Sequence, residues 1–81
     1  MTEAEKDTGR SIAAVKAILD GRDPQGQYSA ILVTLEHAVA AALLMMFNNP
    51  AMAAGMLNEG LLQGIESRLA LYASKAKEVS R

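Results

Sequence analysis

Ten consecutive apolar residues, Ala38–Phe47, form the most hydrophobic stretch of the chain. Around and before this run, apolar residues recur at alternating spacings of four and three, which is the pattern of a helix in a bundle. The members of this stripe are Tyr28, Leu32, Leu35, Val39, Ala42 and Met46. The pattern predicts a helix over residues 28–47. Because its polar residues all lie in the first half, the second half is apolar on every side and must be covered on every side.

The apolar run stops at Asn48, Asn49 and Pro50. Asparagine tolerates the left-handed backbone found just past a helix end, and asparagine followed by proline is a typical start of a new helix. A third helix is therefore expected over residues 50–78. Its apolar stripe, which extends backward through Asn58 and Gly55, consists of Leu62, Ile65, Leu69, Tyr72, Ala76 and Val79. Such a short connection predicts a long antiparallel hairpin of the second and third helices. Gly60 leaves open whether the third helix kinks.

A first helix is predicted over residues 3–20. Thr2 and Glu5 have the spacing of a capping box, in which each residue satisfies a free amide of the other. Gly21 ends the pattern. The helix carries one narrow apolar stripe, made of Ile12, Val15, Ile18 and Leu19, so we expect it to cover something with a single face.

The segment between the first two helices, residues 21–27, contains two glycines and a proline and is predicted to be a loop. Asp23 followed by Pro24 would suit the cap and first residue of a helix. Gly26 instead favours a start near Tyr28. The pattern leaves this boundary open.

These elements predict an all-α chain with a single helical domain over residues 1–81. A chain of this length buries a small fraction of its surface, yet 51% of its residues are hydrophobic and its mean hydropathy is +0.10. This excess of hydrophobic residues suggests that the chain buries a second surface in addition to its own core. We therefore expect a homodimeric helical bundle, or a higher even oligomer. Another helical protein is the other partner that such a surface would suit.

The predicted interface lies on the apolar half of the central helix and at the start of the third. Its alanines leave room for another backbone to approach closely, whereas a monomer core would usually contain larger side chains. The residues predicted to form the interface are Ala38, Ala41, Ala42, Leu44, Met45, Phe47, Met52 and Met56.

A membrane span is not expected from this pattern. A span requires about 20 predominantly apolar residues, and extending the run to that length brings in Glu36 and His37. The chain has no cysteine, and its acidic, polar beginning lacks the features of a secretory signal. A cytoplasmic location is the expectation. With a net charge of −1, the chain also lacks the basic surface that nucleic acids attract.

The residues offer little for catalysis or for metal binding. His37 is the only histidine, which excludes sites that need two from one chain. Neighbouring residues on a helix point about 100° apart, so Glu36 and His37 do not form a dyad by adjacency. We predict no catalytic residue, no metal site and no cofactor, and therefore no enzyme.

The function that this pattern favours is a small structural or protein-interaction module that self-associates through the apolar half of its central helix. An alternative is a carrier for a small apolar or lipid-like ligand, because methionines adapt to irregular surfaces. Four of them surround the expected turn: Met45, Met46, Met52 and Met56. A less favoured alternative is an enzyme that uses Glu36 and His37 across a dimer interface.

Overall fold

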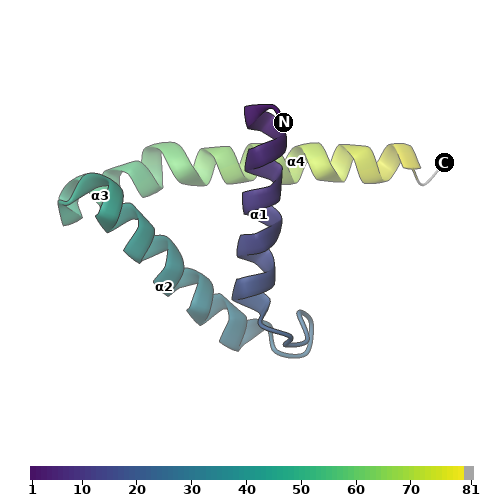
Figure 1. Cartoon of the computed structure of the whole chain (residues 1–81), viewed down its shortest axis with the longest axis horizontal. Helices are drawn as coiled ribbons and strands as arrows, with labels where there is room; N and C mark the ends of the chain where they lie inside the picture. Colours follow the sequence, from purple (N-terminus) through teal and green to yellow (C-terminus); the bar gives the residue numbers. More distant parts are fainter. Residues whose placement is uncertain (80–81) are drawn as a thin grey trace. The chain divides into compact units, whose positions relative to one another are not determined.

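A computed structural model describes the backbone of residues 1–79 and the side chains of residues 1–76. Every element in these described residues is helical, which confirms the all-α class (Figure 1). The elements in order are α1 (Glu3–Leu19), α2 (Tyr28–Phe47), α3 (Pro50–Met56), the π-helix η1 (Leu57–Leu61) and α4 (Leu62–Val79). The chain divides into two compact units, residues 1–39 and residues 40–81, with the boundary inside α2.

The first unit begins with the predicted capping box. The Thr2 hydroxyl oxygen accepts a hydrogen bond from the Glu5 amide at 3.2 Å, and the Thr2 amide donates to Glu5 Oε1 at 3.1 Å. The Thr2 hydroxyl also donates to Glu5 Oε1 at 3.0 Å. Donation from the Thr2 amide first, and from its hydroxyl second, holds the pKa of the Glu5 carboxyl below its ordinary value.

Helix α1 ends at a left-handed turn. Asp20 has φ 49° and donates its amide to the Lys16 carbonyl at 2.9 Å, and Gly21 follows with φ 72°. Two successive left-handed residues reverse the chain direction within a few atoms. Glycine adopts this backbone without the steric cost that a Cβ would add.

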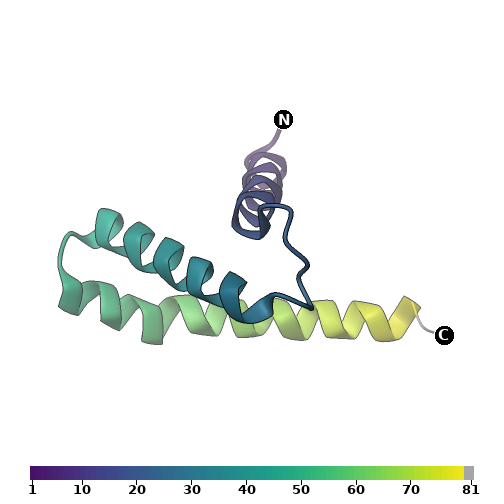
Figure 2. The same cartoon turned by 90° about the horizontal axis from the view of Figure 1, so that it is seen from below.

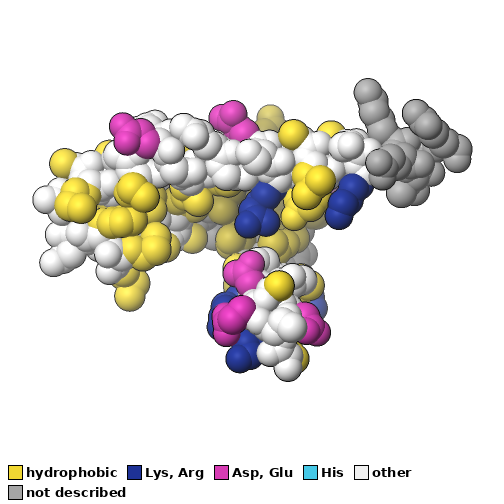
Figure 3. Space-filling view, turned by 90° about the horizontal axis from the view of Figure 1, so that it is seen from above, with side chains coloured by type: hydrophobic (Ala, Val, Ile, Leu, Met, Phe, Trp, Pro, Cys, Tyr) yellow, Lys and Arg dark blue, Asp and Glu magenta, His cyan; other side chains and the backbone are white. Residues whose placement is uncertain are grey.

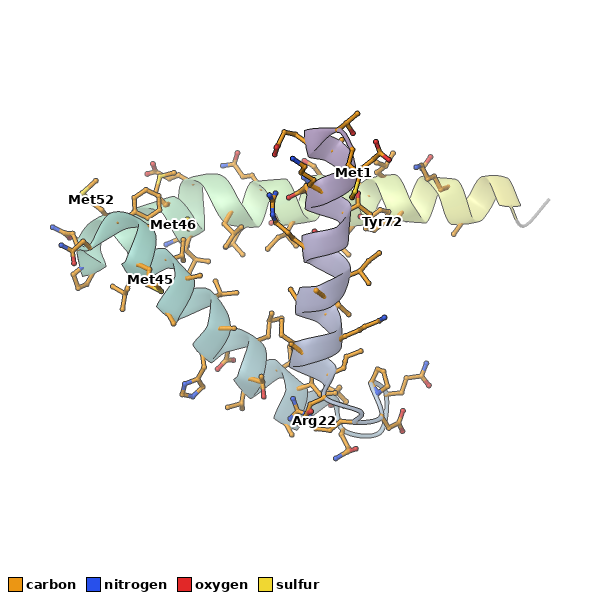
Figure 4. The ribbon with its side chains drawn as sticks, in the orientation of Figure 1. Met1, Arg22, Met45, Met46, Met52 and Tyr72 are labelled. Carbon is orange, nitrogen blue, oxygen red and sulfur yellow. The ribbon has the colours of Figure 1, made fainter. Side chains whose placement is uncertain are left out.

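Arg22 connects the end of α1 to α2 within this unit (Figure 4). Its guanidinium donates to the carbonyls of Ile18 and Leu19, the latter at 3.0 Å, and to the Thr34 hydroxyl at 3.0 Å. The carbonyls at a helix end have no helical partner and carry partial negative charge, so a cation stabilises them. Arg22 and Thr34 are half-buried.

The turn before α2 settles the boundary that the sequence leaves open. The Asp23 carboxylate accepts hydrogen bonds from the amides of Gln25 and Gly26, at 3.3 Å and 3.0 Å. The Gln27 side chain accepts from the Asp23 amide at 3.1 Å. A Cβ on Gly26 would collide with the Asp23 carboxylate, so any other residue there would displace the group that closes this turn. Helix α2 therefore begins at Tyr28.

In the second unit, the turn after α2 has the predicted geometry (Figure 2). Asn48 is left-handed, with φ 49°, and donates its amide to the Leu44 carbonyl at 2.8 Å. The Asn49 side-chain oxygen accepts from the amides of Ala51 and Met52, at 2.9 Å and 3.2 Å, and Pro50 begins α3. The turn packs the end of α2 against α3, and Leu43 and Ala53 are each only 6% exposed.

Where one helix is expected over residues 50–78, the structure has α3, η1 and α4 in succession. In η1 the amide of Leu62 bonds to the carbonyl of Leu57, five residues back instead of four. Asn58 is exposed, and its side-chain amide donates to the Ala54 carbonyl at 2.9 Å. A π-turn accommodates one more residue than an α-turn, so the helix changes register near Gly60.

Protonation of Glu5 should open the first turn of α1. A carboxyl whose pKa is lowered by folding stabilises the folded state above its ordinary pKa, and this stabilisation is lost as the pH falls through the lowered value. Thr2→Val removes the hydroxyl bonds, so the pKa of Glu5 should rise toward its ordinary value, whereas Thr2→Ser should leave it unchanged. Carboxyl titration by NMR checks this. A Glu5 pKa at its ordinary value in the native chain would contradict the expectation.

Removal of the Arg22 guanidinium should destabilise the first unit. Arg22→Met leaves two helix-end carbonyls and the Thr34 hydroxyl without this donor, at an expected cost of about 1–3 kcal/mol in the free energy of unfolding. Arg10→Met is the matched control, because Arg10 makes only an exposed 3.9 Å ion pair with Glu3, of a kind worth at most about 1 kcal/mol. Urea denaturation measures both variants. Equal losses of unfolding free energy in the two variants would show that the hydrogen bonds of Arg22 add nothing to stability.

Candidate functional site

The candidate site is the apolar surface of α2 and α3. Among the described residues, only Leu43 and Ala53 are buried. The large apolar side chains around them are open to solvent, and Met45 is 87% exposed. Figure 3 shows hydrophobic side chains gathered at the end of the second unit, where α2 meets α3. Monomeric soluble proteins rarely expose contiguous apolar patches of this kind, which typically mark interaction sites.

The predicted interface residues lie at this surface, with Phe47 half-buried and the other seven exposed. They do not share one face of α2. Ala38, Ala41, Ala42 and Met45 recur at three- and four-residue spacing and form one side of the helix. Leu44 lies on the packed side, near Leu43. Figure 4 places Met45, Met46 and Met52 around the turn between α2 and α3.

The stripe that the sequence suggests for α2 differs from the packed side in the structure. Leu43, which is not a member of that stripe, is the buried residue of α2. Of the six members of the stripe, Val39 is half-buried and the other five are exposed. In a helix that is apolar on all sides, periodicity does not identify the packed face, because every face carries apolar side chains.

A hollow of about 230 Å³ lies between the end of α2 and α3. Its lining residues are apolar: Ala40, Leu43, Leu44, Pro50, Ala53, Ala54 and Leu57. None of the methionines around the turn lines it. Four lining residues, Leu43, Ala53, Ala54 and Leu57, were not singled out from the sequence, whereas Ala40 is one of the alanines expected to face a partner. The three- and four-residue spacings counted outward from the turn are the signal that could have found them.

The polar candidates are not assembled into a reactive group. Glu36 and His37 are exposed, and within residues 1–76 neither makes a side-chain hydrogen bond or ion pair. No three His, Asp or Glu side chains in the described part of the chain lie close enough to hold a metal ion. The geometry therefore supplies no reactive site from these side chains.

The length and composition of α2 are sufficient to cross a membrane. The helix has 20 residues, and its most apolar 18-residue window has a mean hydropathy of 2.0 and is 6% buried. The helix reaches this length because it begins ten residues before the run of Ala38–Phe47 and includes Glu36 and His37. One such helix near the beginning of a chain is weak evidence for a span, since the core helices of soluble proteins and signal sequences have the same properties.

Two features were not anticipated from the sequence. The contact of Arg22 with Thr34 joins residues twelve positions apart, and no local pattern points to it. The π-turn of η1 has a weak signal in Gly60, which lowers helix propensity where the register changes. Comparison with protein families, with curated proteins and with solved structures finds no significant match to the chain, so the function of this surface is argued from its geometry alone.

Proposed function

We propose that this chain is a structural or protein-interaction module that self-associates, as a homodimer or a higher even oligomer, through the apolar second half of α2. One observation carries the proposal: Ala38–Phe47 has no polar side chain on any face, and Leu43 is its only buried residue. A second copy of the chain provides an apolar cover of matching chemistry. Closed two-fold symmetry is the commonest arrangement for such a self-complementary surface.

Burial of this surface would contribute favourable free energy to association. Full burial of one large aliphatic side chain contributes about 1.5–3 kcal/mol. Leu44, Met45 and Met46 are 45%, 87% and 64% exposed and would contribute part of that amount each. The face of Ala38, Ala41 and Ala42 allows two helix backbones to approach closely.

A helix hairpin would present this surface. The left-handed Asn48 and the cap at Asn49 reverse the chain, and the packing of Leu43 and Ala53 holds α3 against the end of α2. These local contacts support an antiparallel hairpin continued by α4, and two hairpins would form a helical bundle.

An aqueous, cytoplasmic setting fits α2 better than a bilayer. Glu36 lies near the middle of the helix, where an acidic side chain costs about 2.5–3.5 kcal/mol on insertion scales. The segment after α2, residues 48–58, contains no Lys or Arg to anchor a span at the membrane surface. The nearest cation before α2, Arg22, bonds to the end of α1 and to Thr34.

A charge on the alanine face should separate the assembly. We expect the native chain to show an even multiple of its 8.6 kDa mass by light scattering. Ala41→Glu should lower that mass or unfold the chain, because a buried, unpaired carboxylate costs several kcal/mol. Glu36→Ala is the control and should leave the mass unchanged.

Two results would contradict this proposal. One is a native chain that stays a folded monomer at high concentration, with the mass and melting temperature of Ala41→Glu unchanged. The other is recovery of the native protein only from the membrane fraction, which would make lipid the cover of α2.

The hollow between α2 and α3 favours a second candidate function, a carrier of a small apolar ligand. Its walls are apolar, and its volume of about 230 Å³ approaches the roughly 300 Å³ at which small-molecule pockets begin. The ligand would lie against Leu43 and Leu57 rather than among the methionines. Because the hollow offers only apolar contacts, it would distinguish ligands by their shape and size.

Filling the hollow should abolish binding of an apolar ligand. We expect the native chain to enhance the fluorescence of N-phenyl-1-naphthylamine, and Ala54→Phe to reduce this enhancement at least tenfold, because the ring would occupy the hollow. Ala51→Phe is the matched control, since Ala51 is exposed on α3 and does not line the hollow. Equal fluorescence with all three proteins would exclude the hollow as the binding site.

A further inference from the structure

The packed face of α3 defines a direction along the second unit. Ala53 is buried and Leu57 is half-buried, and both line the hollow beside the end of α2. In an α-helix a face recurs every three or four residues, because each residue turns by about 100°. Residues beyond Leu57 that continue this face are therefore set by the helix register.

An uninterrupted α-helix would continue the face with a mixed set of residues. Counted from Leu57 in steps of four and three, they are Leu61, Gly64, Arg68, Leu71 and Lys75. This set contains two cations and a glycine. No continuous apolar surface would follow from α3 into α4.

The π-turn of η1 changes this outcome. It accommodates one extra residue, so Leu62 takes the position that Leu61 would have, and every later residue is shifted by about 100°. The continuation of the face becomes Leu62, Ile65, Leu69, Tyr72 and Ala76, named here the α4 seam. Every member of this set is apolar or aromatic.

Side-chain and backbone bonds support the π-turn. The Leu57 amide is shared between the carbonyls of Ala53 and Ala54, and the Asn58 side chain adds a second donor to the Ala54 carbonyl. Such bonds compensate for the disturbed helical ladder at the register change. A Cβ at Gly60 would lie 3.6 Å from Met56 Cε, an ordinary contact, so lack of space does not explain this glycine.

We propose that η1 is a one-residue phase shifter that makes the α4 seam a second contact surface for another copy of this chain. The inference rests on the proposed self-association. A stable interface takes about 20–30 residues and about 800 Å² from each partner, and the second half of α2 has ten residues, four of them alanine. Leu62, Ile65, Leu69 and Tyr72 are 40%, 41%, 61% and 58% exposed and supply the missing area.

Deletions on either side of the register change test this role. Deletion of Gly60 removes the extra residue, so η1 can become α-helical while Leu62 stays in phase with Leu57; we expect the native oligomer with an unchanged Kd. Deletion of Ser67, inside regular α4, brings Ala70 and Ala73 to the places of Leu69 and Tyr72. We expect at least a tenfold rise in the Kd of the oligomer.

An insertion gives an independent comparison. One alanine added after Gly60 brings Gly64 and Arg68 to the places of Ile65 and Leu69, and the Kd should rise at least as much as on deletion of Ser67. Sedimentation over a concentration series measures the Kd, and circular dichroism verifies that each variant remains helical.

The outcomes separate this inference from the proposed function. A native oligomer whose Kd changes equally on deletion of Gly60 and of Ser67 would overturn the phase-shifting role and leave self-association standing. An oligomer whose Kd is unchanged by deletion of Ser67 would show that the α4 seam lies outside the interface. This result too would overturn the inference and leave self-association standing. A native monomer would overturn both.

Discussion

The second half of α2 exposes side chains that water solvates poorly, and the need to cover this surface is the constraint on which the other features of the molecule depend. A helix that is apolar on every side cannot be covered by a single neighbour. In the described part of the chain, contact with α3 buries Leu43 and Ala53 and leaves the alanine face and the methionines open. The stability of the molecule is therefore tied to what covers α2.

With so small a core, local hydrogen bonds define the elements. Thr2 caps α1, Asn49 caps α3, and the Asp23 carboxylate closes the turn before α2. The hydrogen bonds of Arg22 reach further along the sequence, because they join the end of α1 to Thr34 in α2. Each of these interactions contributes about 1 kcal/mol or somewhat more. They determine where helices begin and end, whereas apolar burial has to provide most of the free energy of folding.

The same surface provides apolar contacts rather than reactive groups. Reactive sites bring polar groups together in a pocket, but the hollow beside Leu43 has apolar walls, and Glu36 and His37 are exposed without partners among residues 1–76. The register change at η1 enlarges the apolar surface. It extends an apolar face from α3 into α4, where an unbroken helix would have placed Arg68.

The sequence by itself determined that the chain is helical, where α1 begins and where α2 ends. The end of α2, the capping box at Thr2 and the roles of Asn48 and Asn49 were predictable, because each depends on residues within about four positions. The start of α2 was not, because Asp23 and Gly26 favour different starts. The sequence also predicted that the chain has more apolar residues than its own core can bury, and the exposed candidate residues are among them. Only the tertiary structure decided that Leu43 is the buried residue of α2, because a uniformly apolar helix has no periodic face to read. It also decided the partner of Arg22 and the alignment of the α4 stripe with Leu57 instead of Asn58. A contact across twelve residues and a hydrogen bond to the fifth residue back depend on packing rather than on local preference.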